Sequence, residues 1–151
     1  MKTTLILTAL IGLFLVSPRL QAGDVTFSDA PAPAIVLNGL DTYRTGTSGA
    51  ALDVWLAGSA LGKAQDTRDA LQKQFTQFET TNGKMLRFEQ IGGVSPSPSV
   101  RVNWYTICYS KGVAFVEFTS YQGKSSWIIT NIRLSTDYRD ILPAWQIPIE
   151  R

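Results

Sequence analysis

The chain has 151 residues, of which 44% are hydrophobic, and a formal net charge of +2. Its length allows one domain that buries a core of its own. It has no histidine and only one cysteine, Cys108, so it lacks the usual ligands of zinc, copper and iron and cannot form an internal disulfide. It also lacks the dense basic segment of a nucleic-acid surface. We therefore expect no metal, no cofactor and no nucleic-acid partner.

The first residues, 1–22, have the pattern of a secretory signal peptide. Lys2 precedes an apolar run over residues 5–16, and Ala22 offers a small residue at which cleavage can occur. The run has roughly half of the ~20 residues that span a bilayer, so we expect no membrane insertion once the leader is removed. Lys2 and Arg19 leave with the leader, and the remaining charges balance. These features predict an exported protein, periplasmic or extracellular.

A polar, proline-containing segment follows the leader. Residues 23–33 are predicted to form a flexible arm, and residues 34–151 a single domain with an apolar C-terminal tail. The first helix is expected to begin near Ala34, and its apolar residues recur at helical spacing until Gly46. Ser48 suits the N-cap of a second helix, which the glycines after residue 57 interrupt.

A third helix is predicted from Thr67 to Asn82. Asp66 suits its N-cap, and Gly83 suits a left-handed closing residue at its C-terminus. Its apolar side chains recur at i, i+4 and i+7 and form one hydrophobic face: Leu71, Phe75 and Phe78. The first half of the domain is therefore expected to contain three helices.

After Gly83 the pattern changes to alternation, and β-branched and aromatic residues predominate. The predicted strands are 84–91, 100–109, 113–121 and 126–134. Their short connections, including the Ser-Pro repeat at 95–99, allow only antiparallel neighbours. The apolar run at 113–118 indicates that parts of the sheet are covered on both faces or curl around a core. The fold class is therefore predicted as α+β, with three N-terminal helices packed on a curved four-stranded antiparallel meander.

Several stretches resemble small exported members of the nuclear transport factor two-like superfamily of cystatin-like cone domains: LDTY at 40–43, ALDVWLAGS at 51–59, FTSY at 118–121, WIITN at 127–131 and ILP at 141–143. The resemblance covers residues 34–143 and implies a cone with a pocket between helices and sheet. Some enzymes of the superfamily use a histidine–aspartate pair, which this chain cannot form. Isomerase-like members use an aspartate base with a tyrosine and a protonated acid, which Tyr105 or Tyr121 and Glu117 would imitate.

Glu117 is the first candidate for a functional side chain, because a carboxylate between apolar neighbours in a strand either faces water or lies in the cone. In the cone, burial would raise its pKa and make it an acid or a ligand contact. A three-residue loop would place it on the same face as Asn131 and Arg133, whereas a two- or four-residue loop would separate them. Gly123 and Lys124 favour a two-residue loop, so we expect separate faces.

Alternation divides the strand at 100–109 into two sets. One set is polar or aromatic: Arg101, Asn103, Tyr105 and Tyr109. The other is interpreted as core: Val100, Val102, Trp104 and Cys108. The first set lines a pocket, faces solvent or forms a protein interface. The candidate ligand contacts are Tyr105, Glu117, Asn131 and Arg133, and we assign no catalytic residue.

The tail at 142–149 is apolar, and its prolines exclude a regular helix or a central strand. It either packs across the domain or binds a partner through Trp145 and Ile147, which would form an exposed apolar patch. We therefore expect a non-enzymatic exported domain that binds a small apolar ligand or a protein partner, with a homodimer through the outer face of the sheet as one form. The alternatives are a pocket enzyme of the isomerase or hydrolase kind, which uses a carboxylate and tyrosines, and a structural component of the envelope.

Overall fold

The computed structural model describes residues 30–147, so the predicted signal peptide at 1–22 and most of the predicted arm lie outside the described residues. The helices are α1 (Ala34–Thr45), α2 (Ser48–Trp55), α3 (Ala60–Lys63) and α4 (Gln65–Asn82). The strands are β1 (Met85–Ser97), β2 (Val100–Tyr109), β3 (Val113–Gln122) and β4 (Trp127–Ser135). The C-terminal segment contains two short 3-10 turns, η1 (Tyr138–Asp140) and η2 (Ala144–Gln146).

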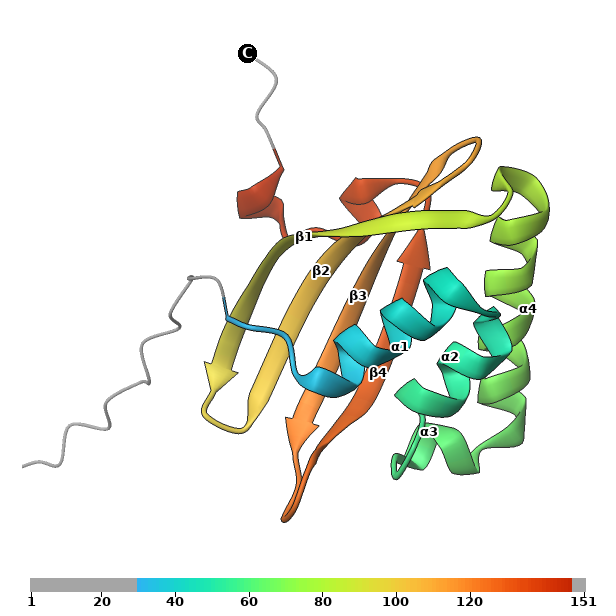
Figure 1. The fold of residues 1–151 in the computed structure, drawn as a ribbon. Coiled ribbons are helices and arrows are strands. Elements are labelled where there is room, and N and C mark those ends of the chain that lie inside the picture. The colour runs from blue at the N-terminus through green and yellow to red at the C-terminus, as the bar shows by residue number, and fades with distance from the viewer. Residues whose placement is uncertain (1–29, 148–151) are drawn as a thin grey trace, which may run out of the picture.

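The strands form one antiparallel sheet in the order β1-β2-β3-β4, and the helices gather on one side of it (Figure 1). We call the side toward the helices the inner face and the opposite side the outer face. This arrangement confirms the predicted α+β class and the antiparallel meander. It differs from the prediction in the number of helices, because the four-residue helix α3 precedes α4.

The two predicted N-caps are each displaced by one or two residues. Thr47, rather than Ser48, caps α2, because its hydroxyl accepts a hydrogen bond from the N–H of Ala50 at 3.2 Å. Helix α4 begins at Gln65 without a side-chain cap, so Asp66 lies inside its first turn. The Asp66 carboxylate still stabilises the helix there, because it is close to the positive end of the helix dipole.

Strand β1 is longer than predicted. Gly83 ends α4 with a φ of 82°, which confirms the predicted left-handed residue, and β1 then continues through most of the Ser-Pro repeat that was expected to be a connection. Pro96 is compatible with the strand because β1 is at the edge of the sheet, where the missing N–H removes no ladder bond from a neighbour. A register shift between Val94 and Ser97 accommodates it.

Aromatic side chains fill the space between the helices and the inner face. Trp55 of α2 is fully buried, and its ring centroid lies 5.1 Å from that of Phe118 and 5.5 Å from that of Phe75. The Trp55 indole N–H donates to the carbonyl of Val36 in α1 at 3.1 Å. Each such ring removes about 150–250 Å² from water, so these contacts dominate the energy of the core. The interior of the implied cone is therefore packed with side chains around Trp55.

A second apolar cluster lies on the outer face, where the C-terminal segment crosses the sheet. Val94 and Trp104 are buried there against Ile141. Phe115 packs edge-on against Tyr138, with 5.9 Å between the ring centroids. The expectation that parts of the sheet are covered on both faces is therefore confirmed.

The two faces of β2 are the reverse of our interpretation. Asn103, Tyr105 and Tyr109 are buried on the inner face, whereas Trp104 and Cys108 are on the outer face. Alternation separated the two sets correctly. It did not show which set met the helices, because β2 is covered on both faces and neither set is uniformly apolar.

The end of the predicted arm that the structure describes is anchored to the sheet. Ala30 is buried, and its carbonyl accepts a hydrogen bond from the side-chain amide of Asn103 at 2.8 Å. Residues 30–33 therefore lead into α1 from a fixed point on the inner face. None of the helices within residues 30–147 is long and apolar enough to cross a membrane.

Candidate functional site

The inner face of the sheet changes from apolar to polar at the end where the chain enters α1. Asn103 and Ser120 are both fully buried there, and Arg101 is half-buried. Arg101 is directly opposite Ser120, and Ser120 is directly opposite Ile129. The Oδ1 atom of Asn103 and the Oγ atom of Ser120 have no hydrogen-bond partner among the described residues. Such atoms are uncommon in a folded interior, so this polar end of the core requires an explanation.

Arg101 of β2 contacts residues of both β1 and β4. Its guanidinium carbon lies 5.3 Å from the centroid of the Trp127 ring, which is within the range of a cation–π interaction. One guanidinium nitrogen donates to the hydroxyl of Ser95 at 3.5 Å, the limit for a hydrogen bond. By the register of the strands, Arg101 is the direct β2 neighbour of Ser120.

Trp127 forms one wall of an open groove of about 540 Å³, which we call the Trp127 groove. The other lining residues come from α1, α2 and the turns that flank α2 and β4: Ala34, Ile35, Asn38, Val54, Ala57, Gly58 and Ser126. Four of these residues are small: Ala34, Ala57, Gly58 and Ser126. Gly58 has a φ of 73°, a left-handed conformation that glycine adopts without strain.

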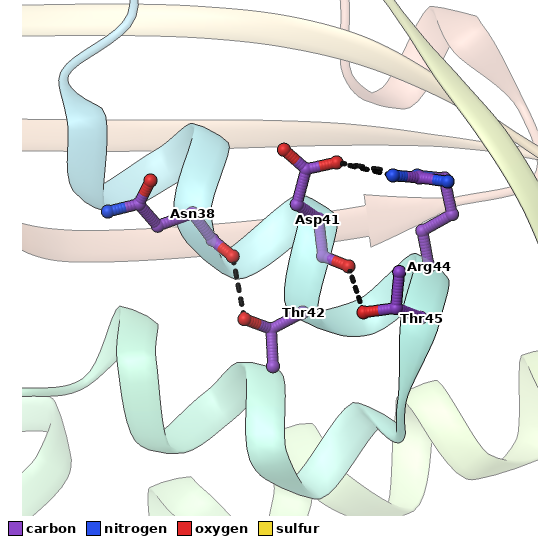
Figure 2. Close-up of polar contacts among 5 residues, drawn as sticks. All are labelled: Asn38, Asp41, Thr42, Arg44 and Thr45. Carbon is purple, nitrogen blue, oxygen red and sulfur yellow. Dashed lines mark hydrogen bonds and ion pairs between the residues drawn. The ribbon is translucent and has the colours of Figure 1, made fainter.

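The side-chain amide of Asn38 is one of the few polar groups in the Trp127 groove. Figure 2 shows this residue on α1, where its backbone carbonyl accepts a hydrogen bond from Thr42 at 2.8 Å. Its side-chain amide has no hydrogen bond to the residues described. Further along α1, Asp41 and Arg44 form an ion pair of 3.0 Å with each other. The groove thus combines an apolar surface with an unused donor and acceptor at its α1 wall.

The predicted ligand contacts do not form one site. Glu117, Asn131 and Arg133 are all on the outer face, whereas Tyr105 is buried on the inner face with its hydroxyl 3.4 Å from the side-chain oxygen of Gln90. The expectation that Glu117 and Arg133 lie on separate faces is wrong. They are directly opposite each other, and their side chains form an ion pair of 3.6 Å.

The reason is a β-bulge. The loop between β3 and β4 has the four residues 123–126, which alone would separate Glu117 from Arg133. A register shift after Thr119 adds one residue to β4 and restores the shared face. The prediction used the length of the loop alone and did not include this extra residue.

Glu117 is held on the outer face by two partners. Its side chain is 14% exposed, and it accepts a hydrogen bond from the indole N–H of Trp104 at 3.0 Å in addition to the ion pair with Arg133. Arg133 also donates to the backbone carbonyl of Asp140. Through Arg133, the carboxylate therefore links the sheet to the C-terminal segment.

The predicted partner contacts lie in the C-terminal segment. Trp145 is 54% exposed, and its ring packs edge-on against Trp104 with 6.1 Å between the centroids. Ile147 is the last described residue and is half-buried. The described part of the tail therefore packs on the outer face and still leaves the Trp145 indole largely exposed, so partner binding through Trp145 and Ile147 stays a prediction. The segment also covers part of the outer face that was considered for a homodimer.

A pair of buried tyrosines was not identified from the sequence. The hydroxyls of Tyr43 and Tyr109 are 3.0 Å apart, and both rings are in the main core. The pKa of Tyr109 is raised to about 12, mainly by burial; the hydrogen bond with Tyr43 lowers it and the charge of Glu79 raises it. Burial and the hydrogen bond with Tyr109 raise the pKa of Tyr43 well above 10. Both hydroxyls therefore stay protonated at neutral pH.

Tyr43 and Glu79 also line a second open hollow of about 450 Å³, together with Lys84. Because the Tyr43 hydroxyl is already hydrogen-bonded to Tyr109, it has less capacity to bind a ligand in this hollow. Within residues 30–147, no group of three or more histidine, cysteine or acidic side chains is arranged to hold a metal ion.

Comparisons with protein-family models, curated proteins and solved structures found no match for this chain. The geometry of the site is therefore the basis for any functional argument. The Trp127 groove offers shape and apolar surface for binding, and Arg101, which does not line the groove, contacts the Trp127 ring.

Proposed function

We propose that this chain is an exported, non-enzymatic binding domain whose ligand occupies the Trp127 groove. The observation that carries the proposal is the half-buried indole of Trp127, which lines an open hollow together with small and aliphatic residues of α1, α2 and the adjoining turns. Ligand sites are mostly apolar hollows of about 300–1,000 Å³ with a few polar groups, and the volume and lining of this groove fit that description. The ligand class is therefore a small apolar or aromatic molecule.

Export is part of the proposal and rests on the leader-like residues 1–22. The resemblance to nuclear transport factor two-like cone domains also remains a proposal, and the order of helices and strands supports it. In that architecture the Trp127 groove would be an opening at the side of the cone, since the interior around Trp55 is filled.

Binding is favoured over the alternative of a pocket enzyme. The carboxylate considered for catalysis, Glu117, is engaged by Trp104 and Arg133 on the outer face. Tyr105 is on the inner face, so these two side chains cannot act on the same substrate atom. General acid–base catalysis requires its groups within hydrogen-bond reach of one proton.

The test uses N-phenyl-1-naphthylamine, a neutral apolar probe whose fluorescence rises when it leaves water. Ala57→Trp fills the groove from an exposed position, so it should weaken probe binding at least about tenfold while the fold is retained. Ala70→Trp is the matched control, because Ala70 is exposed on α4 and does not line the groove. Far-UV circular dichroism checks that both variants fold.

Saturable binding that Ala57→Trp abolishes and Ala70→Trp retains would support the proposal. Equal binding by wild type and Ala57→Trp would place the probe elsewhere, for example at Trp145 on the outer face, and would overturn it. The absence of saturable binding to the wild type would overturn it as well.

A further inference from the structure

We infer that the ligand of the Trp127 groove is an anionic amphiphile, with an apolar body in the groove and a carboxylate, sulfonate or phosphate at Arg101. This inference rests on the proposed function and names its ligand class. Three observations carry it: the absence of an ion pair at Arg101, the contact of Arg101 with Trp127, and the unpartnered hydroxyl of Ser120.

Arg101 is the exception among the arginines that the structure describes. Residues 30–147 contain six, and five of them have a carboxylate oxygen within 4.0 Å: Arg44, Arg68, Arg87, Arg133 and Arg139. Arg101 has none in this part of the chain, although it is half-buried. A guanidinium offers five N–H donors, and only one of them is used, in the long bond to Ser95.

A cation that is partly withdrawn from water without a counter-ion lowers stability, because it loses hydration and gains no ion pair. The neighbouring acidic side chains do not provide a counter-ion for Arg101. Asp41 and Asp53, on the helices that line the groove, are paired with Arg44 and Arg68 at 3.0 and 2.6 Å. Glu117 is on the opposite face of the sheet. No carboxylate within residues 30–147 therefore pairs with Arg101, which leaves its guanidinium available to an anion from outside.

The position of Arg101 connects this unpaired charge to the groove. Its guanidinium carbon is 5.3 Å from the centre of the same indole that forms the groove wall. Arg101 itself does not line the groove, so the polar end of a ligand that packs on Trp127 would extend past the edge of the indole to the guanidinium. Arginine is well suited to this task, because its planar fork binds carboxylate, sulfonate and phosphate oxygens in pairs.

Ser120 supplies an independent sign of an unfilled polar contact. It is fully buried directly opposite Arg101, and its Oγ has no partner among the described residues. The Oγ atom is covered in this structure, so Ser120 would donate to a head group at Arg101 only when ligand binding uncovers it. The unpartnered Oδ1 of Asn103 is an acceptor on the next row of the inner face, and it would keep the anion at Arg101 rather than deeper in the core.

Two probes with one apolar skeleton test the inference. N-phenyl-1-naphthylamine is neutral, and 8-anilino-1-naphthalenesulfonate carries a sulfonate on the same ring system. Wild type should bind the sulfonate at least about tenfold more tightly, and Arg101→Gln should remove this preference while the affinity for the neutral probe stays within about twofold. Arg87→Gln is the control, because Arg87 is an exposed arginine on β1 that is paired with Glu89.

The outcomes are distinguishable. If both probes bind equally to wild type, or if Arg101→Gln weakens both equally, the head-group role of Arg101 is wrong while the groove remains. If neither probe binds, the proposed function fails and the inference with it. Arg101→Lys should retain part of the preference for the sulfonate, since it keeps the charge and loses the fork; complete retention would contradict a paired contact.

A free acid and an anionic lipid share this head-group chemistry. Displacement of the sulfonate probe by dissolved decanoate, but not by phosphatidylglycerol vesicles, would identify a soluble amphiphile. Displacement by vesicles alone would identify a membrane lipid. Displacement by neither would overturn the inference, because both carry the proposed chemistry.

Discussion

Glu117 of β3 is directly opposite Arg133 of β4, and one extra residue in β4 produces this pairing. Without the bulge, the four-residue loop would place the arginine on the inner face, among the core aromatics. With it, the ion pair lies on the outer face and joins the sheet to the C-terminal segment through the carbonyl of Asp140. The charged residues are therefore part of the attachment of the tail rather than of a pocket.

The first prediction concerns the two roles of Glu117. Glu117→Gln keeps an acceptor for the Trp104 indole and loses the ion pair with the half-exposed Arg133, so it should cost less than about 1 kcal/mol of unfolding free energy. Glu117→Ala leaves the indole N–H without a partner and should cost about 1–3 kcal/mol. Urea unfolding at neutral pH measures both. Equal losses would mean that the Trp104 hydrogen bond contributes nothing.

The second prediction is a loss of stability at alkaline pH. Tyr43 and Tyr109 have folded-state pKa values above the ordinary value of 10, because burial disfavours tyrosinate. The unfolded state therefore releases their protons first. Their stabilising effect is complete below pH 10 and is lost as the pH rises through about 12. Urea midpoints should be constant below pH 10 and fall above it.

Tyr109→Phe provides the comparison for this alkaline effect. The variant has one fewer raised pKa, so its stability should fall less steeply between pH 10 and about 12, although it starts lower because Tyr43 loses a hydrogen-bond partner. Tyrosinate absorbance follows the ionisation directly. A wild-type curve with the same alkaline slope as the variant would contradict the argument.

The third prediction is the requirement for glycine at position 39. A Cβ atom there would lie 2.0 Å from Nε1 of Trp55, so Gly39→Ala should displace the indole from its bond to Val36 and cost roughly 1–3 kcal/mol. Gly49→Ala is the control in α2, since the nearest atom to its Cβ would be the end of the flexible Gln72 side chain at 3.1 Å. The thermal midpoint of each variant decides the difference. A neutral Gly39→Ala would show that α1 and α2 can move apart without loss.

The fourth prediction separates the anchored part of the tail from its exposed part. Ile141 is buried against Trp104 on the outer face, so Ile141→Ala should cost about 2–5 kcal/mol. Trp145 is mostly exposed, so Trp145→Ala should cost less, about 1 kcal/mol or below. Denaturant unfolding of both variants is the measurement. The opposite order would mean that Trp145 holds the tail.

Much of the secondary structure was readable from local patterns. The bounds of β2 agree with the prediction, and Gly83 closes α4 as expected, because alternation and the glycine C-cap are local signals. The candidate site was harder to predict from the sequence. Arg101 and Trp127 are on different strands with β3 between them, so their contact depends on two registers at once.

The pattern of apolar residues by itself determined the α+β class and the antiparallel meander, since helical and alternating periodicities are properties of short segments. Tertiary structure alone decided which face of β2 met the helices, because the C-terminal segment buries the other face and makes both faces resemble a core. It also decided the register of β3 and β4, because a single bulged residue moves every following side chain to the other face. The groove beside Trp127 and the unpaired charge of Arg101 follow from those long-range choices.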